Sequence, residues 1–164
     1  MTNGYKKPNL KSLYFDDEVQ KISSLQGKTI AITGTTTGIG FVAARTVANK
    51  GARALLLNRK SERSKSSYHR LKKENPGANI VNIECDLQSF GSVRKAALRV
   101  IDLCQDGLDS LCNNAGIMAL KDEATVDGFD VQMQTNHLSH FLLTKEFLPL
   151  LKTAAELRGD ARVV

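Results

Sequence analysis

The chain has 164 residues, 41% of them apolar and 24% charged, with a formal net charge of +6. This length fits one compact domain, and these fractions exclude a disordered polymer. No apolar run reaches the ~18 residues of a membrane-spanning helix, and the N-terminus has no signal-peptide stretch. The three cysteines, at positions 85, 104 and 112, have no CxxC spacing. We therefore expect a cytoplasmic protein without a membrane span, disulfide framework or zinc knuckle.

The charge is divided unevenly along the chain. Residues 1–75 carry 15 basic and 5 acidic side chains, whereas residues 76–164 carry 8 and 12. A basic half should face an anionic partner, which the charge alone leaves open as nucleic acid, an anionic membrane surface or a phosphorylated small molecule. Nucleic acid is disfavoured because only 5% of the residues are aromatic and no nucleic-acid motif is present.

The predicted elements follow a polar extension, residues 1–26, that shows no sustained period. An apolar strand at 29–33 runs into glycine-rich sequence, and a helix follows up to Gly51. Strands at 54–57, 80–85 and 108–112 alternate with helices at 62–74 and 89–104, the second capped by Ser89. A long helix at 127–152, which Pro149 should kink or end, precedes a fifth strand that starts at Arg162. One helix between successive strands indicates βαβ crossovers and an α/β fold with a doubly wound parallel sheet in residues 27–164.

The glycine-rich segment lies between a predicted strand and a predicted helix, the context in which it binds a dinucleotide. Gly34 permits the sharp turn, Gly38 lets the backbone approach a pyrophosphate, and Gly40 allows the helix to pack closely on the strand. The alternative is a merely flexible turn. No Gly-Lys-Ser/Thr follows, which disfavours a nucleoside-triphosphate P-loop.

The end of the second predicted strand points to NADP(H) rather than NAD(H). NAD-binding sheets place a carboxylate there, but no acid occurs between Gly40 and Glu62. The strand runs instead into Asn58-Arg59-Lys60, with Arg63 one helical turn beyond, and these groups suit a 2′-phosphate. The alternative is a solvated basic helix start.

Four motifs in order resemble the short-chain dehydrogenase/reductase family. They are Thr33-Gly34-x-x-x-Gly38-Ile39-Gly40, Asp86-Leu87, Asn113-Asn114-Ala115-Gly116 and Asn136-His137-Leu138. Residues 136–151 look most like the branch of retinol dehydrogenases and light-dependent protochlorophyllide reductases. The resemblance implies a Rossmann sheet of strand order 3-2-1-4-5, of which this chain holds the N-terminal part.

The resemblance also implies roles for individual residues. Thr35 and Ile39 belong with the glycines to the cofactor loop, Asp86 would bond the adenine amino group, and Leu87 would contact the ring through its backbone. The run from Asn113 through Asn114 and Ala115 to Gly116 would pass beneath the riboses. Asn136 would be catalytic and hold a water that serves an active-site lysine. The plainer alternatives are a helix cap for Asp86, a turn for Asn113 and Asn114, and a polar outer helix face for Asn136.

The sequence departs from the family in its length. The family's serine and Tyr-x-x-x-Lys pair lie beyond the fifth strand, where this sequence stops. We expect a fragment, inactive alone, of an enzyme that transfers hydride between NADP(H) and a carbonyl or alcohol substrate, with a homo-oligomer possible for the full-length protein. A non-catalytic NADP-binding or interaction protein is the alternative. Tyr68-x-x-x-Lys72 is attributed to chance, no metal site is expected at the histidines, and Ser139, where Gly is common, should alter helix packing.

Overall fold

The computed structural model describes residues 12–164, whose strands form one five-stranded sheet in the order β3-β2-β1-β4-β5. Every strand pairs with its neighbours in parallel. The strands are β1 (Thr29–Thr33), β2 (Arg53–Asn58), β3 (Ile80–Glu84), β4 (Ser110–Cys112) and β5 (Arg162–Val163). The predicted doubly wound α/β fold and its strand order 3-2-1-4-5 are confirmed.

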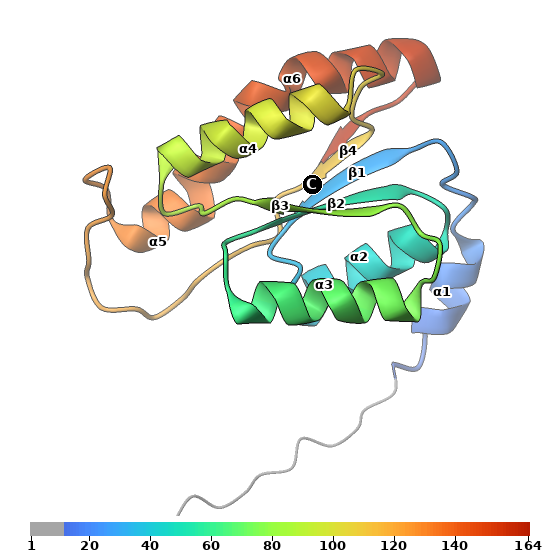
Figure 1. Ribbon diagram of the computed structural model, residues 1–164, viewed down its shortest axis with the longest axis horizontal. Coiled ribbons are helices and arrows are strands. Elements are labelled where there is room, and N and C mark those ends of the chain that lie inside the picture. Colours follow the sequence, from blue (N-terminus) through green and yellow to red (C-terminus); the bar gives the residue numbers. More distant parts are fainter. Residues whose placement is uncertain (1–11) are drawn as a thin grey trace, which may run out of the picture.

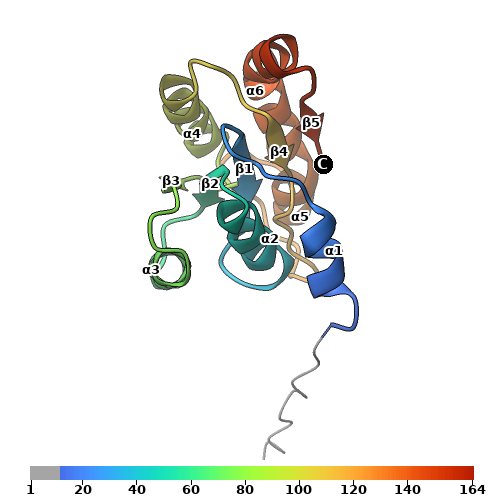
Figure 2. The same cartoon turned by 90° about the vertical axis from the view of Figure 1, so that its right-hand side faces the viewer.

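The sheet is covered on both faces, as its apolar strands require. Helices α2 (Gly38–Asn49) and α3 (Glu62–Glu74) cover one face, and α4 (Phe90–Leu103) and α6 (Ser139–Arg158) cover the other (Figures 1 and 2). Alternate residues of β2 enter the two cores: Leu55 and Leu57 pack toward α4 and α6, whereas Ala54 and Leu56 pack toward α2 and α3. The period of two along each strand therefore fixes which side chains lie in which core.

A short helix lies inside the predicted N-terminal extension. Helix α1 (Phe15–Lys21) has three acidic residues in its first turn, which favour the helix N-terminus, and Lys21 pairs with Glu18 at 2.7 Å. Seven residues are too few to show a helical period, which is why the sequence did not predict it. The chain then reaches β1 along the end of α2, where the Leu25 N–H donates to the Lys50 carbonyl at 2.8 Å.

The predicted long helix at 127–152 is wrong at its start and is longer at its end, and Pro149 does not end it. It is three pieces, α5 (Val131–Met133), a π-helical turn η1 (Gln134–Leu138) and α6. The helix begins at 131 because the Asp130 side chain caps it, accepting the Met133 N–H at 2.8 Å. It continues past Pro149 because Phe147, Leu151 and neighbouring residues remain buried against the sheet and α4.

Among the described helices, none has both the length and the apolar character needed to cross a bilayer.

Candidate cofactor-binding site

The carboxyl end of β1 runs into a glycine loop that leads directly into α2. Gly34 and Gly38 have φ angles of 71° and 60°, in the left-handed region that favours glycine. Neighbours on both sides of β1 hold the loop: the Gly34 N–H donates to the Leu57 carbonyl at 3.1 Å, and the Asn114 amide donates to the Thr33 carbonyl at 2.9 Å. The bend between β1 and α2 is therefore fixed by hydrogen bonds.

The first turn of α2 is open toward the loop. A Cβ at Gly38 would meet no atom within 4 Å, and Ile39 is 82% exposed, whereas Gly40 is buried. The N-cap residue Thr37 makes no side-chain bond to the helix, although serines cap α3 and α4. Within residues 12–164, the first N–H groups of α2 thus have no side-chain cap, the arrangement that binds a phosphate.

The side chain of Asn58, the last residue of β2, is used to hold the glycine loop. Its Oδ1 accepts the Thr35 N–H at 2.8 Å, and its Nδ2 donates to the Thr35 hydroxyl at 2.8 Å. Asn58 is 4% exposed and Thr35 is fully buried, so water cannot replace either bond. The paired bonds join the end of β2 to the loop after β1.

Replacing Asn58 with leucine should lower the free energy of unfolding by about 2–3 kcal/mol, because it leaves the buried Thr35 N–H and hydroxyl unpaired. Thr35→Val is the matched variant, since it removes one of the two bonds and keeps the other, and it should cost about 1 kcal/mol. Urea unfolding at neutral pH measures both losses. Equal stability of Asn58→Leu and wild type would show that the pair does not hold the loop.

A cavity of about 340 Å³ lies along the carboxyl ends of the strands. Its lining residues are Gly34, Thr36, Leu57, Asn58, Arg59, Ser61, Arg63, Cys85, Asp86, Leu87, Gln88, Ala115, Gly116, Ile117 and Thr135. Seven of the residues predicted to bind a cofactor thus meet there: Gly34, Asn58, Arg59, Asp86, Leu87, Ala115 and Gly116. Seven further predicted site residues stand outside this lining: Thr35, Gly38, Ile39, Gly40, Asn113, Asn114 and Asn136.

The loop after β3 supplies one wall of the cavity. The Asp86 carboxylate accepts the Gln88 N–H at 3.0 Å, and the N-cap of α4 is Ser89, so the helix-cap alternative for Asp86 is wrong. The Leu87 side chain is buried, and its carbonyl accepts the Ser139 hydroxyl at 2.6 Å. Ser139 therefore ties the start of α6 to this loop through a bond that a glycine there could not make.

The loop after β4 supplies the opposite wall. The Ala115 N–H donates to the Thr33 hydroxyl at 2.9 Å, and the Asn114 amide reaches both the Thr33 and the Gly34 carbonyls. Asn113 has a buried Oδ1 with no hydrogen-bond partner among the described residues. Asn114 thus joins this loop to the glycine loop and does more than form a turn.

Asn136 lies in η1 beside this second loop. Its Oδ1 accepts the Ile117 N–H at 2.8 Å, and its Nδ2 donates to the Ile117 carbonyl at 2.8 Å. The residue is exposed, as the alternative of a polar outer helix face expects, but its side chain is bonded to the loop through both polar groups. Its catalytic role stays a prediction.

A nicotinamide dinucleotide fits these residues. The uncapped start of α2 and the open space at Gly38 would accept its phosphates, and the cavity between Arg59 and Asp86 would accept its adenosine half. A further polar atom, the Thr135 hydroxyl, is buried at the cavity lining with no hydrogen-bond partner among the described residues.

Cys85 and the Tyr68-x-x-x-Lys72 pair are buried, half-buried or hydrogen-bonded within the fold. Burial, with a smaller contribution from the charge of Asp86, raises the pKa of Cys85 to about 12, so this thiol at the cavity wall is protonated at neutral pH. Tyr68 is half-buried against the α2–α3 core, and Lys72 donates to the Ala78 carbonyl at 2.9 Å. Across residues 12–164, no three His, Cys, Asp or Glu side chains are grouped to hold a metal ion.

Sequence reasoning missed several cavity residues. Ser61 caps α3 beside the arginines, and its place before a helical segment was a signal that could have been used. Thr135 precedes Asn136, and no sequence pattern places it at the cavity because the π-helical turn sets its direction.

Comparisons with known proteins agree with this architecture. The family model for short chain dehydrogenases matches residues 28–163. An uncharacterized oxidoreductase, C736.13 of Schizosaccharomyces pombe, is 41% identical over 145 residues, which cover 87% of this chain and 42% of that protein. Human retinol dehydrogenase 13 is 35% identical over 136 residues, which cover 83% of this chain and 41% of that protein.

Solved structures give the same result. RhlG of Pseudomonas aeruginosa, in a complex described as an NADP active-site complex, superposes with a TM-score of 0.71 at 33% identity, covering 85% of this chain and 54% of that chain. The chain therefore spans about two-fifths to one half of the length of these proteins. Since the family match runs from the start of β1 into β5, the predicted family resemblance is confirmed, and the chain belongs to the short chain dehydrogenase family.

Proposed function

We propose that this chain is the cofactor-binding part of an NADP(H)-dependent oxidoreductase that interconverts a carbonyl and an alcohol. The observation that supports it best is the cavity at the carboxyl edge of the sheet, where the glycine loop, two arginines and the loops after β3 and β4 meet. NADP(H), when bound, supplies or accepts the hydride.

Recognition of the 2′-phosphate is assigned to the end of β2. Arg59 and Arg63 both line the cavity, and both are exposed, so their guanidinium groups can reach a phosphate without losing an internal partner among the described residues. Asn58, in contrast, has its side chain bonded to Thr35, and we assign it an indirect role through the loop. The carboxylate of Asp86 would select the adenine amino group.

The opposite end of the site is assigned to proton handling. Asn136 bonds Ile117 through both side-chain groups, which fixes the π-helical turn against the loop that passes beneath the nicotinamide ribose. There it would hold the water that serves the lysine of the full-length protein. The serine, tyrosine and lysine of that reaction are expected beyond residue 164.

Calorimetric titration of the protein with NADP⁺ and with NAD⁺ tests the cofactor assignment. We expect tighter binding of NADP⁺, and Arg59→Gln should weaken it by about 10- to 100-fold, since a charge-assisted hydrogen bond contributes that much. Lys65→Gln is the matched control, because it also removes one positive charge, at an exposed residue of α3 that lies outside the cavity. Equal affinity for the two nucleotides, or equal losses in the two variants, would contradict the assignment.

The non-catalytic alternative uses the same site, so cofactor binding does not separate it from an enzyme. Sequencing the transcript past the codon for Val164 does: a serine followed by Tyr-x-x-x-Lys supports the oxidoreductase, and a stop codon supports a non-catalytic NADP-binding protein. The cytoplasmic location, the homo-oligomer and the absence of a nucleic-acid partner stay predictions from the sequence.

A further inference from the structure

A buried histidine connects the two halves of the candidate site. His140, in the first turn of α6, is 6% exposed and lies between β1 and η1. Its Nε2 is 3.0 Å from the hydroxyl of Thr33, the last residue of β1, and its Nδ1 is 3.2 Å from the Asn136 carbonyl. One side chain thus touches the strand that leads into the glycine loop and the residue assigned to proton handling.

The hydrogen-bond partners determine where the ring carries its proton. A carbonyl only accepts, so Nδ1 must donate to Asn136. Burial lowers the pKa of His140, and its bond to Asn136 offsets this only in part, so the ring is neutral near pH 7. Nε2 then accepts the Thr33 hydroxyl proton at 3.0 Å, a shorter contact than the 3.4 Å from that hydroxyl to the Cys112 carbonyl, while the Thr33 oxygen accepts the Ala115 N–H at 2.9 Å. Each group has a matching partner in this single tautomer.

The carbonyl that His140 bonds belongs to a residue of the π-helical turn, Asn136. In η1 the Ser139 N–H donates to the Gln134 carbonyl, five residues back, instead of the carbonyl four residues back. This shift changes the backbone pairing around Asn136, and the imidazole of His140 bonds its carbonyl from the following turn. The ring therefore supports the turn that directs Asn136 at Ile117.

We propose that His140 is a positioning residue that holds Asn136 and the end of β1 in register, so that the cofactor loop and the proton-handling residue are placed together. The inference rests on the proposed function, because the register is useful only where a nicotinamide ring lies between the two. His140 is not among the residues that line the cavity, and it acts through Thr33, Ala115 and Asn136.

Two substitutions separate the two bonds. His140→Asn places an amide near the position of Nδ1, so it can keep the bond to Asn136 and lose the bond to Thr33. His140→Gln places its amide oxygen near the position of Nε2, so it can keep the bond to Thr33 and lose the bond to Asn136. His137→Gln, at an exposed residue of the same segment, is the matched control and should change nothing.

Two measurements on the intact protein test the bonds of His140 to Thr33 and to Asn136. Calorimetry compares NADP⁺ with 2′,5′-ADP, which lacks the nicotinamide half. His140→Asn should weaken the binding of NADP⁺ about tenfold, which is the effect of one lost buried hydrogen bond. It should change the affinity for 2′,5′-ADP by less than about threefold. Hydrogen exchange follows the Ile117 amide, which Asn136 protects. His140→Gln should accelerate its exchange about tenfold, whereas His140→Asn should leave it slow.

A purely structural role would give a different pattern. A general loss of stability in the fold would weaken the binding of both nucleotides alike and accelerate amide exchange throughout the sheet. That pattern in both variants, or a wild-type ¹⁵N spectrum with the His140 proton on Nε2, would overturn the proposal. Failure of the wild type to bind either nucleotide would instead overturn the proposed function, and the tautomer and the Ile117 exchange would still decide whether His140 holds Asn136.

Discussion

Replacing Gly40 with alanine should weaken NADP⁺ binding by about 100-fold, the order that an ångström of misplacement costs in a preorganised site. Gly40 lies in the first turn of α2, and a Cβ there would collide with the Gly34 carbonyl oxygen and with Nδ2 of Asn114. The first atom belongs to the backbone of the glycine loop, and the second donates to Thr33 and Gly34, so neither can move without shifting the loop. Calorimetry with NADP⁺ measures the loss.

Gly91→Ala is the matched control for this substitution. Gly91 also lies in the first turn of a helix, α4, but its Cβ would meet only Ser89 Oγ, at 3.6 Å. The alanine should therefore leave nucleotide binding unchanged and raise the free energy of unfolding by up to about 1 kcal/mol, because alanine favours the helix. If Gly40→Ala bound NADP⁺ as tightly as Gly91→Ala, the close packing of α2 on the loop would not be required for binding.

Elements that depend on a short-range pattern of residues could be predicted from the sequence. The apolar run of β2 was placed at 54–57 and is observed at Arg53–Asn58, and the helix at 62–74 is observed with the same bounds. The glycine spacing likewise predicted a sharp turn at Gly34, and the φ of Gly34 is positive there. These features depend on side chains that are close in sequence, so the pattern contains them.

Features that depend on contacts between distant segments could not be predicted. The π-helical turn changes the period for only five residues, and side chains in it and beside it bond distant segments, Asn136 to Ile117 and His140 to Thr33. The passage of α6 through Pro149 depends on tertiary burial that offsets the cost of the proline. The sequence likewise assigned Asn58 to the cofactor, and only the structure shows its amide bonded to Thr35.

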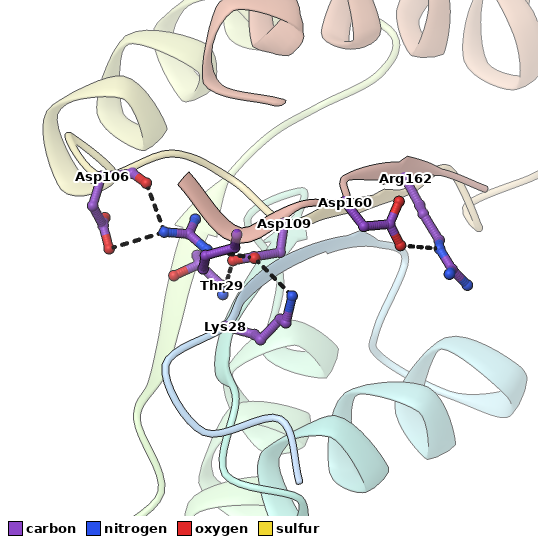
Figure 3. A network of polar contacts seen from close by, with 7 residues as sticks. Lys28, Thr29, Asp106, Asp109, Asp160 and Arg162 are labelled. Atoms are coloured by element: carbon purple, nitrogen blue, oxygen red, sulfur yellow. Dashed lines mark hydrogen bonds and ion pairs between the residues drawn. The ribbon is translucent and has the colours of Figure 1, made fainter. Parts of the chain in front are cut away.

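Another such feature is a buried carboxylate at the end of the sheet opposite to the cavity. Asp109 has a side chain only 3% exposed, and it accepts the Thr29 N–H at 2.8 Å and Arg158 Nε at 2.7 Å (Figure 3). Lys28 Nζ is 3.4 Å away. The carboxylate joins the start of β1 to the end of α6, two segments that lie far apart in the sequence.

Removing this carboxylate should produce the largest loss of stability. Asp109→Ala is expected to lower the free energy of unfolding by about 3–5 kcal/mol, because it leaves the Thr29 N–H and the Nε of the partly buried Arg158 without their acceptor, and Arg158 then keeps only its contacts with Asp106. Asp160→Asn is the control, since the exposed pair of Asp160 with Arg162 should contribute at most about 1 kcal/mol. Urea unfolding at neutral pH compares the two variants, and equal losses would contradict a special role for Asp109.

The pH dependence of stability gives an independent test of the same group. Burial by itself would raise the pKa of Asp109, but hydrogen bonds from Arg158 and Thr29 and the charges of Arg158 and Lys28 outweigh it, so the pKa is lowered. A carboxyl with a lowered pKa in the folded state stabilises the protein fully above its unfolded pKa of about 3.9, and loses that contribution as the pH falls toward the folded value. The stability difference between wild type and Asp109→Asn should therefore be constant from pH 7 to about 5 and shrink below about pH 4. A difference that grew on acidification would mean that the folded protein prefers this carboxyl protonated, which its three cationic or N–H partners oppose.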